Sequence, residues 1–254
     1  MKQIIKVSNV TKIYGSKSNK TTALQNVDLE INEGEFVGIM GPSGSGKSTL
    51  LNVISTIDTT TSGSINYEGK DIGKLKENEL SDFRKNELGF IFQDFNLLDT
   101  LSVEENIILP LAISRINVKE IKKRLIDVTK ILGIDTILKK YPYQISGGQK
   151  QRTAAARAII NNPRLVLADE PTGALDSKSS TELLTCMKKL NKKYNSTILM
   201  VTHDSFAASY CDRILFIKDG KIYSELISNG NRKEFYNRII DVLAKMGGDL
   251  NDLL

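Results

Sequence analysis

The sequence predicts an α/β fold in which a parallel core sheet is joined by an N-terminal antiparallel β subdomain and an inserted α-helical subdomain. Short apolar runs rich in β-branched residues occupy positions 36–40, 165–168 and 197–201, between stretches of helical pattern. Such runs are typical of buried parallel strands with crossover helices. Each run ends in polar residues, and ligands bind outside the carboxyl ends of such strands. We therefore expect the three strand ends to meet at one site.

The remaining segments indicate how the domain is organised. Residues 4–30 alternate in polarity, with turn signals at 14–16 and 17–20, which predicts short antiparallel strands. A strongly charged helical pattern covers positions 97–138. We expect one domain over residues 1–226, with a helical subdomain inserted at about 95–160 and a C-terminal helical extension at 227–254.

Composition narrows the class of protein. The 254 residues are 40% hydrophobic and 26% charged, as in an ordinary globular chain. Lys and Arg exceed Asp and Glu by only 35 to 30, too small an excess to indicate a nucleic-acid partner. Cys186 and Cys211 have neither CxxC nor zinc-ligand spacing, which fits a reducing cytoplasm. No signal peptide or run of about 18 apolar residues is evident, so any membrane role is expected to come through a partner.

A phosphate-binding loop follows the first buried strand. The pattern G-x-x-x-x-G-K-[ST] lies between that strand and a helix predicted to start near Ser48, as the motif requires. Glycines let backbone N–H groups wrap the phosphates, and the helix N-terminus adds its positive dipole end. Lys47 supplies a point charge, and the Ser48 hydroxyl is a ligand for Mg²⁺. The predicted nucleotide-binding residues of this loop are Gly41, Pro42, Ser43, Gly44, Ser45, Gly46, Lys47, Ser48 and Thr49.

Two adjacent acids, Asp169 and Glu170, end the second buried strand. Beside a phosphate loop, Asp169 is a candidate ligand for Mg²⁺, and Glu170 can orient or deprotonate the attacking water. The phosphate loop by itself leaves kinases, GTPases and many ATPases open. Segments further along the chain have to decide among them.

The discriminating segment is Ile145 to Gln149, just before a helix predicted at 150–160. It closely resembles the LSGGQ signature of ATP-binding cassette (ABC) proteins, with Ile145 as a volume-conserving replacement of the leading Leu. Its serine hydroxyl, glycines and helix N-terminus predict a second anion site. The resemblance implies that this segment contacts the γ-phosphate of ATP held by a second copy. The residues concerned are Ser146, Gly147, Gly148 and Gln149.

The other positions of the ABC pattern are filled over about residues 3–226. The resemblance implies that Tyr14 stacks on adenine and that Gln93 reaches both the metal and the attacking water. It also implies that residues 174–176 form the D-loop at the dimer interface. His203, the one histidine of the sequence, matches the γ-phosphate sensor. We therefore expect Glu170, Gln93 and His203 to be catalytic, ATP and Mg²⁺ to be bound, and Ser48, Gln93 and Asp169 to hold the metal.

Further features separate the ABC branches. Too few residues lie between Lys47 and Ile145 for the coiled coil of repair ATPases, and the chain has one cassette rather than the two of translation-associated proteins. Residues 90–107 resemble the lipoprotein-release and macrolide-export branch. The phrases at 207–213 and 216–220 resemble the bacitracin- and nisin-resistance ATPases of Gram-positive bacteria.

These resemblances imply a head-to-tail homodimer that powers a membrane permease in antimicrobial-peptide resistance, by export or by release of the peptide's target. We expect no nucleic-acid partner, a peripheral position on the cytoplasmic face of the cell membrane, and a sensor kinase reached through the permease. The alternatives are an ABC ATPase that acts on nucleic acid or ribosomes, and a lipoprotein-release or macrolide-export ATPase.

Two apolar groups remain to be placed. Phe95, Leu97 and Leu98 follow Gln93 and are predicted to contact the permease, with burial in the core as the alternative. The tail has an apolar helical face that could pack on its own domain, on a second copy or on the permease, and self-packing is the default. Its residues are Phe235, Ile239, Ile240, Leu243 and Met246.

Overall fold

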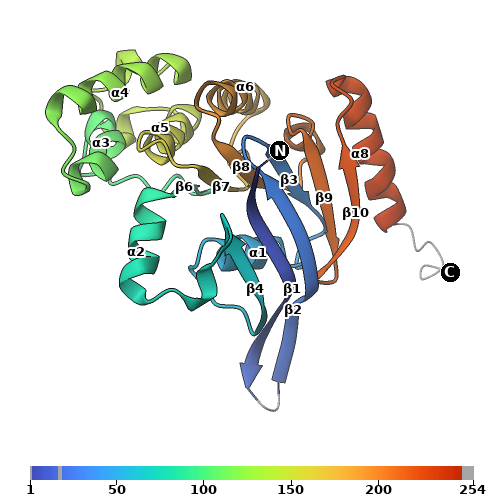
Figure 1. The fold of residues 1–254 in the computed structure, drawn as a ribbon. Helices are drawn as coiled ribbons and strands as arrows, with labels where there is room; N and C mark the ends of the chain where they lie inside the picture. The colour runs from blue at the N-terminus through green and yellow to red at the C-terminus, as the bar shows by residue number, and fades with distance from the viewer. Residues whose placement is uncertain (1, 17–18, 248–254) are drawn as a thin grey trace. The chain divides into compact units, whose positions relative to one another are not determined.

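The computed structural model describes residues 2–16 and 19–247. It consists of two compact units (Figure 1). The first unit contains Met1–Lys76 and Leu199–Leu254, and the second contains Glu77–Ile198. The chain enters the second unit after Lys76 and returns to the first within strand β8 (Thr197–Val201), all of whose residues are buried.

The first unit begins with an antiparallel sheet of order β2-β1-β4-β5. The prediction of short strands at the start of the chain was wrong, because β1 and β2 are each 14 residues long. The pairing of β1 with β2 is interrupted by register shifts of the β-bulge type. Asn9 and Asn26 adopt left-handed backbone, with φ of 49° and 48°. Residues 14–16 belong to β1 instead of a turn, and 17–18 lie outside the described residues. The strands are β1 (Gln3–Ser16), β2 (Asn19–Asn32), β4 (Ser62–Tyr67) and β5 (Lys70–Asp71), followed by the 3-10 turn η1 (Ile72–Lys74).

The same unit contains β3 (Phe36–Met40), which is entirely buried and pairs in parallel with β9 (Arg213–Lys218). Strand β9 continues through a tight hairpin into β10 (Lys221–Ile227). Asp219 and Gly220, with φ of 50° and 73°, have the left-handed conformations that a two-residue hairpin loop needs. Helix α1 (Lys47–Ile54) follows β3, and α7 (Ser205–Ala208) follows β8.

In the second unit, β6 (Leu88–Ile91) and β7 (Leu165–Asp169) form a parallel pair. Helices α3 to α6 gather around these strands (Figure 1). The helices are α2 (Glu77–Asn86), α3 (Val103–Ile113), α4 (Val118–Leu132), α5 (Gly147–Ile159) and α6 (Ser177–Tyr194), with 3-10 turns η2 (Asp135–Ile137) and η3 (Pro142–Gln144).

Three helices, α3 to α5, fall within the helical subdomain expected at about 95–160. The compact unit that contains them is wider, Glu77–Ile198, because it also includes β6, β7 and α6. The bounds of an inserted subdomain within a 1–226 domain therefore stay a prediction. The expectation of an α/β fold with parallel strands and an antiparallel sheet is confirmed.

The C-terminal helix α8 (Arg232–Gly247) packs on the first unit, beside β9 and β10 (Figure 1). Phe235, Ile239 and Met246 are buried, Leu243 is half-buried and Ile240 is exposed. The Lys218 ammonium donates to the carbonyl of Met246, and the Arg232 guanidinium lies 4.5 Å from the centre of the Tyr210 ring. Most of the apolar face thus packs on its own domain. Residues 248–254 of the predicted extension lie outside the described residues.

Truncation of the best-buried residue of α8 tests this packing. Phe235→Ala is expected to lower the free energy of unfolding by about 3–5 kcal/mol, because a fully buried aromatic ring is replaced by a cavity. The control Tyr236→Ala removes a ring that is already 37% exposed and should cost well under half as much. Urea unfolding followed by circular dichroism measures both. Equal losses would show that α8 is not held by its buried face.

Along residues 2–16 and 19–247, no helix combines the length and the apolar character needed to cross a membrane.

Candidate ATP-binding and hydrolysis site

The phosphate loop connects β3 to α1, and its glycines are needed for steric reasons. A Cβ on Gly46 would lie 2.4 Å from the carbonyl oxygen of Ala23, and Gly46 has φ of +102°. A Cβ on Gly41 would lie 2.1 Å from the carbonyl oxygen of Ile217. No other residue fits either position without displacing backbone. Gly44, with φ of +76°, has open space around it and lies on the exposed part of the loop.

Lys47 folds back over this loop. Its ammonium donates to the carbonyl oxygens of Gly41 at 2.9 Å and Pro42 at 2.7 Å, and the residue is 7% exposed. The buried hydroxyl of Ser45 has no hydrogen-bond partner among the described residues. The loop therefore presents an ammonium, an unused polar atom and the N-terminus of α1 together, which is the composition of an anion site. Ser48 is exposed at that N-terminus.

Tyr14 lies on β1 of the same unit and is 40% exposed. Its hydroxyl donates to Asp58 at 2.7 Å, and the Lys12 ammonium lies 4.8 Å from the centre of its ring. Burial and the Asp58 carboxylate raise the pKa of Tyr14, so the phenol keeps its proton at neutral pH. These contacts hold the Tyr14 ring, with its hydroxyl neutral, at the surface, where the ring can stack on a planar group.

His203 also belongs to the first unit and is exposed. The N–H of Thr202, the residue before it, donates to the carbonyl of Ile39 at 3.1 Å. Since Ile39 lies in β3, just before the phosphate loop, the histidine is tied to the strand that carries this loop. Asp204 follows as the N-cap of α7, where it accepts from the N–H of Phe206 at 2.9 Å.

In the second unit, Asp169 ends β7 and Glu170 begins the following turn. Glu170 adopts left-handed backbone with φ of 45°, an unfavourable conformation for this residue type that is found at functional sites. The carbonyl of Glu170 accepts the N–H of Gly173 at 3.0 Å. A Cβ on Gly173 would lie 3.1 Å from the side-chain nitrogen of Gln93. The fold thus brings Gln93 beside the turn that positions Glu170.

Gln151 is a functional candidate that the sequence pattern did not reveal. Its side-chain nitrogen donates to the carbonyls of Phe92 at 3.0 Å and Pro171 at 2.8 Å, and the residue is fully buried. One amide of α5 therefore joins the segment before Gln93 to the segment after Glu170. The available signal was a polar residue on the apolar face of the helix predicted at 150–160, which is uncommon without a polar partner.

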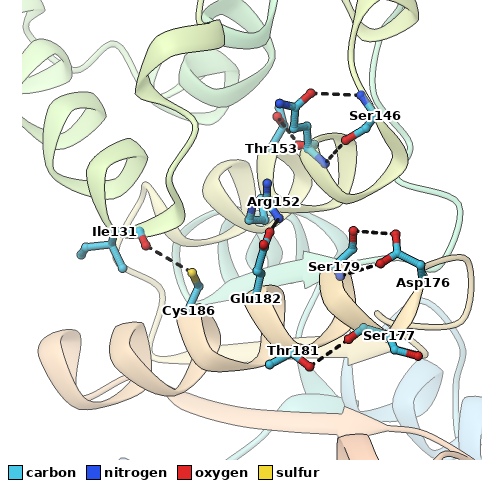
Figure 2. Close-up of polar contacts among 11 residues, drawn as sticks. Ile131, Ser146, Arg152, Thr153, Asp176, Ser177, Ser179, Thr181, Glu182 and Cys186 are labelled. Carbon is cyan, nitrogen blue, oxygen red and sulfur yellow. Dashed lines mark hydrogen bonds and ion pairs between the residues drawn. The ribbon is translucent and has the colours of Figure 1, made fainter.

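Ser146 is the N-cap of α5 and forms a capping box with Gln149 (Figure 2). Its hydroxyl accepts the N–H of Gln149 at 3.3 Å, and the Gln149 side chain accepts the N–H of Ser146 at 3.0 Å. The N-terminus of α5 is exposed at Ser146 and Gly147. Asp176 caps α6 in a similar way, because its carboxylate accepts the N–H and the hydroxyl of Ser179. The bond from the Ser179 N–H is the main reason why the pKa of Asp176 is lowered.

The loop after Gln93 is fixed by two side chains from other elements. Arg157 of α5 donates to the carbonyls of Asn96 at 2.6 Å and Phe95 at 3.0 Å. Asn106 of α3, which is fully buried, pairs with both the N–H and the carbonyl of Leu98. Leu98 is 48% exposed. Phe95 and Leu97 are only half-buried. The expected apolar group is therefore held at the surface instead of forming part of the core.

A hollow of about 320 Å³ opens in the second unit next to this loop. Its walls come from α2, β6, α3 and α5, and Arg157 is one of its lining residues. Phe90 and Phe92 stack with ring centres 4.1 Å apart, and Ile113 is 63% exposed. The basic residues at the hollow are Arg84, Lys85 and Arg157, and its other lining residues are Leu88, Gly89, Phe90, Phe92, Leu109, Pro110, Ile113, Ala158 and Asn161.

The predicted site residues thus form two sets, each assembled within one unit. The first unit holds the phosphate loop, Tyr14 and His203. The second holds Gln93, Asp169, Glu170 and residues 146–149. A phosphate loop on one buried strand and paired acids at the end of another define the class of P-loop nucleotide hydrolases.

Comparison with known proteins identifies the family. The sequence profile of the ABC transporter family matches residues 24–173, more than half of the chain, and the chain belongs to this family as an ATP-hydrolysing subunit. The bacitracin export ATP-binding protein BceA of Halalkalibacterium halodurans is 53% identical over 98% of this chain and 99% of its own length. The macrolide export ATP-binding/permease protein MacB of Mannheimia succiniciproducens is 43% identical over 87% of this chain and 34% of its own length.

Solved structures agree with this assignment. The dimeric structure of MJ0796, an ABC transporter cassette of Methanocaldococcus jannaschii, is 43% identical with a TM-score of 0.82 and covers 90% of this chain and 100% of that chain. A dimeric post-hydrolysis state of MJ0796 bound to ADP and Pi has a TM-score of 0.81 and 42% identity, with the same coverage. The prediction of an ABC-type ATPase is confirmed.

Proposed function

We propose that this chain powers a membrane permease that confers resistance to a bacitracin- or nisin-type antimicrobial peptide, by export or by release of the peptide's target. The observation that carries the proposal is the extent of the match to the bacitracin export protein. The alignment covers 250 residues of a 254-residue chain, so it includes most of the C-terminal extension. The match to the macrolide exporter reaches only 87% of the chain.

In this proposal two copies bind ATP head to tail at the cytoplasmic face of the membrane. The N–H groups of residues 43–48 and the Lys47 ammonium bind the phosphates, and Tyr14 stacks on adenine. The Ser146 hydroxyl already accepts the N–H of Gln149, so it keeps its proton for the γ-phosphate of the partner's ATP. Gly147 and Gly148 leave the N-terminus of α5 open to the same phosphate.

Hydrolysis uses the residues around β7. The Glu170 carboxylate orients the attacking water and accepts its proton, while Gln93, held beside the same turn, keeps that water in line. His203 donates to a γ-phosphate oxygen as negative charge develops there.

The residues present also fit a magnesium ion. The Ser48 hydroxyl, the Asp169 carboxylate and the Gln93 amide are oxygen donors of the kind that Mg²⁺ prefers. Ser48 lies beside a phosphate cradle in which Gly41 and Gly46 leave no room for a side chain, and the Ser45 hydroxyl within the cradle is unpaired among the described residues. When bound, the metal would neutralise charge on the β- and γ-phosphate oxygens.

The permease is proposed to bind at the hollow and at Leu98. Apolar walls with a basic rim of Arg84, Lys85 and Arg157 suit a short amphipathic helix that carries acidic residues. Arg157 lines the hollow and also holds the loop after Gln93, so occupation of the hollow is linked mechanically to the catalytic glutamine. We further propose that a sensor kinase is reached through the permease and that no nucleic acid is bound.

Co-expression with any multi-span membrane protein encoded beside this gene tests the proposal. The two should purify together, and bacitracin or nisin should raise the rate of ATP hydrolysis of the reconstituted complex. Stimulation by macrolides instead would favour a macrolide exporter. A chain that binds no permease and responds to nucleic acid or ribosomes would overturn the transport role.

Leu98→Glu is expected to weaken the complex with the permease at least about tenfold, because a charge then has to be buried in an apolar contact. ATP binding should not change, since Leu98 is 48% exposed and is not one of the predicted nucleotide-binding residues. Co-purification and peptide-stimulated ATPase measure the effect. The control Ile126→Glu places the same charge at a 51% exposed position of α4 and should retain the permease. Loss of ATP binding in Leu98→Glu, or equal loss of permease in both variants, would refute this role.

A further inference from the structure

Helices α5 and α6 meet at two successive levels, and the α6 residues of both contacts, Ser179 and Glu182, have no role in the proposed hydrolysis mechanism. At the first level, Gly148 of α5 faces Ser179 of α6. A Cβ on Gly148 would lie 2.6 Å from the Ser179 hydroxyl oxygen and 2.8 Å from its Cβ. That hydroxyl is itself held by Asp176 at 2.8 Å. The N-terminus of α5 is therefore in direct contact with Ser179, the residue that binds the Asp176 carboxylate at the end of the predicted D-loop.

At the second level, one turn further along both helices, Arg152 of α5 donates to Glu182 of α6 at 2.7 Å (Figure 2). The Arg152 side chain is 11% exposed and that of Glu182 is 44% exposed. The Nε of Arg152 is buried without a hydrogen-bond partner among the described residues. Within the part of the chain that the structure describes, Arg152 thus makes one charged hydrogen bond, and its acceptor is on α6.

We propose that these contacts form a clamp, made of Gly148, Ser179, Arg152 and Glu182, which holds the signature segment and the D-loop as one rigid block. Arg152 and Glu182 are positioning residues in this clamp. The inference rests on the proposed head-to-tail dimer, in which residues 146–149 and 174–176 both act on the partner copy. A block that presents both segments together loses less conformational freedom when the dimer closes than two independent segments would.

The Arg152–Glu182 pair is expected to contribute little to the free energy of unfolding. Glu182 is nearly half exposed, and ion pairs of that kind contribute little to folding. The pair instead fixes the position of the N-terminus of α5 relative to that of α6. Removing the carboxylate should therefore change dimer closure more than folding or ATP binding by the single copy.

The test uses full-length protein in the Glu170→Gln background, with saturating MgATP. Glu182→Ala is expected to raise the dissociation constant of the ATP-bound dimer roughly tenfold, in the range of couplings seen for residues outside a site. Glu182→Gln keeps an acceptor without the charge and should give a smaller increase. Sedimentation measures dimerisation, and a fluorescent ATP analogue measures nucleotide binding by the monomer. That binding and the thermal midpoint should stay within about twofold and a few degrees of the parent.

The matched control is Glu120→Ala. Glu120 pairs with Arg124 at 2.8 Å and has a 42% exposed side chain, but the pair lies within α4 alone. The Glu120→Ala variant should therefore dimerise like the Glu170→Gln parent. A second pair of variants tests the first level: Gly148→Ala should weaken dimerisation, and adding Ser179→Gly should restore part of it by removing the Cβ contact.

The outcomes separate the two proposals. If the Glu170→Gln parent dimerises with ATP but Glu182→Ala dimerises equally well, the clamp is overturned and the proposed function stands. If the parent itself stays monomeric with ATP, the head-to-tail mechanism and the clamp fail together. A Glu182→Ala variant that loses monomer ATP binding or thermal stability in proportion would show a purely structural role and would also overturn the clamp.

Discussion

Glu170→Gln is expected to lower the rate of ATP hydrolysis at least about a hundredfold while ATP binding persists, the usual scale for removal of a general base. The amide keeps the shape of the side chain but cannot accept a proton from the attacking water. The left-handed backbone at Glu170 and the Gln93 side chain beside Gly173 are unaffected by the change, so the rest of the turn should keep its geometry.

Because ATP then persists in the closed state, Glu170→Gln should accumulate as an ATP-bound dimer. Phosphate release measures hydrolysis, and size-exclusion chromatography with and without MgATP measures the dimer. Asp135→Asn, an equally conservative change at an exposed acid of the same unit, is the control and should hydrolyse ATP like the wild type. Undiminished hydrolysis by Glu170→Gln would remove this carboxylate from the mechanism.

Lys47→Met is expected to weaken ATP binding roughly a hundredfold, because charge-assisted hydrogen bonds to the phosphates are lost and each contributes about 1.5–3 kcal/mol. Methionine fills similar space at a residue that is only 7% exposed, so the loop should keep its packing. Two loop carbonyls, of Gly41 and Pro42, lose their donor, which adds some local destabilisation.

Equilibrium binding of a fluorescent ATP analogue measures the loss at Lys47. The matched control is Lys74→Met, at a side chain that is 83% exposed in the same unit and pairs with Asp71. It should bind ATP like the wild type. Wild-type affinity in Lys47→Met would show that the ammonium does not contact phosphate and would weaken the assignment of the whole loop.

Much of the candidate site was predictable because its parts are contiguous in the sequence. The loop from Gly41 to Thr49, the two acids at the end of β7 and the signature at the start of α5 can each be recognised from consecutive residues. The sequence signal for the buried strands was equally local, since β3, β7 and β8 are short apolar runs between polar ends. Their detection needs only hydrophobic periodicity.

The errors arose where local signals compete with long-range pairing. Gly15 and its neighbours predicted a turn, but strand pairing with β2 extends β1 through Ser16. Periodicity in the tail identified one apolar face, yet it could not say that Ile240 lies at its exposed edge while Phe235 and Ile239 are buried. The width of a buried face depends on the surface against which the helix packs.

By itself, the sequence determined the phosphate loop, the strand ends, the signature and the ABC family, because each is encoded within a few consecutive residues. Only the tertiary structure decided that Gln151 joins the segments beside Gln93 and Glu170, that Arg157 fixes the loop before Leu98, and that Arg152 meets Glu182. These contacts join residues far apart in the chain. The pairing of their helices and loops follows from packing across the whole unit, which no short segment specifies.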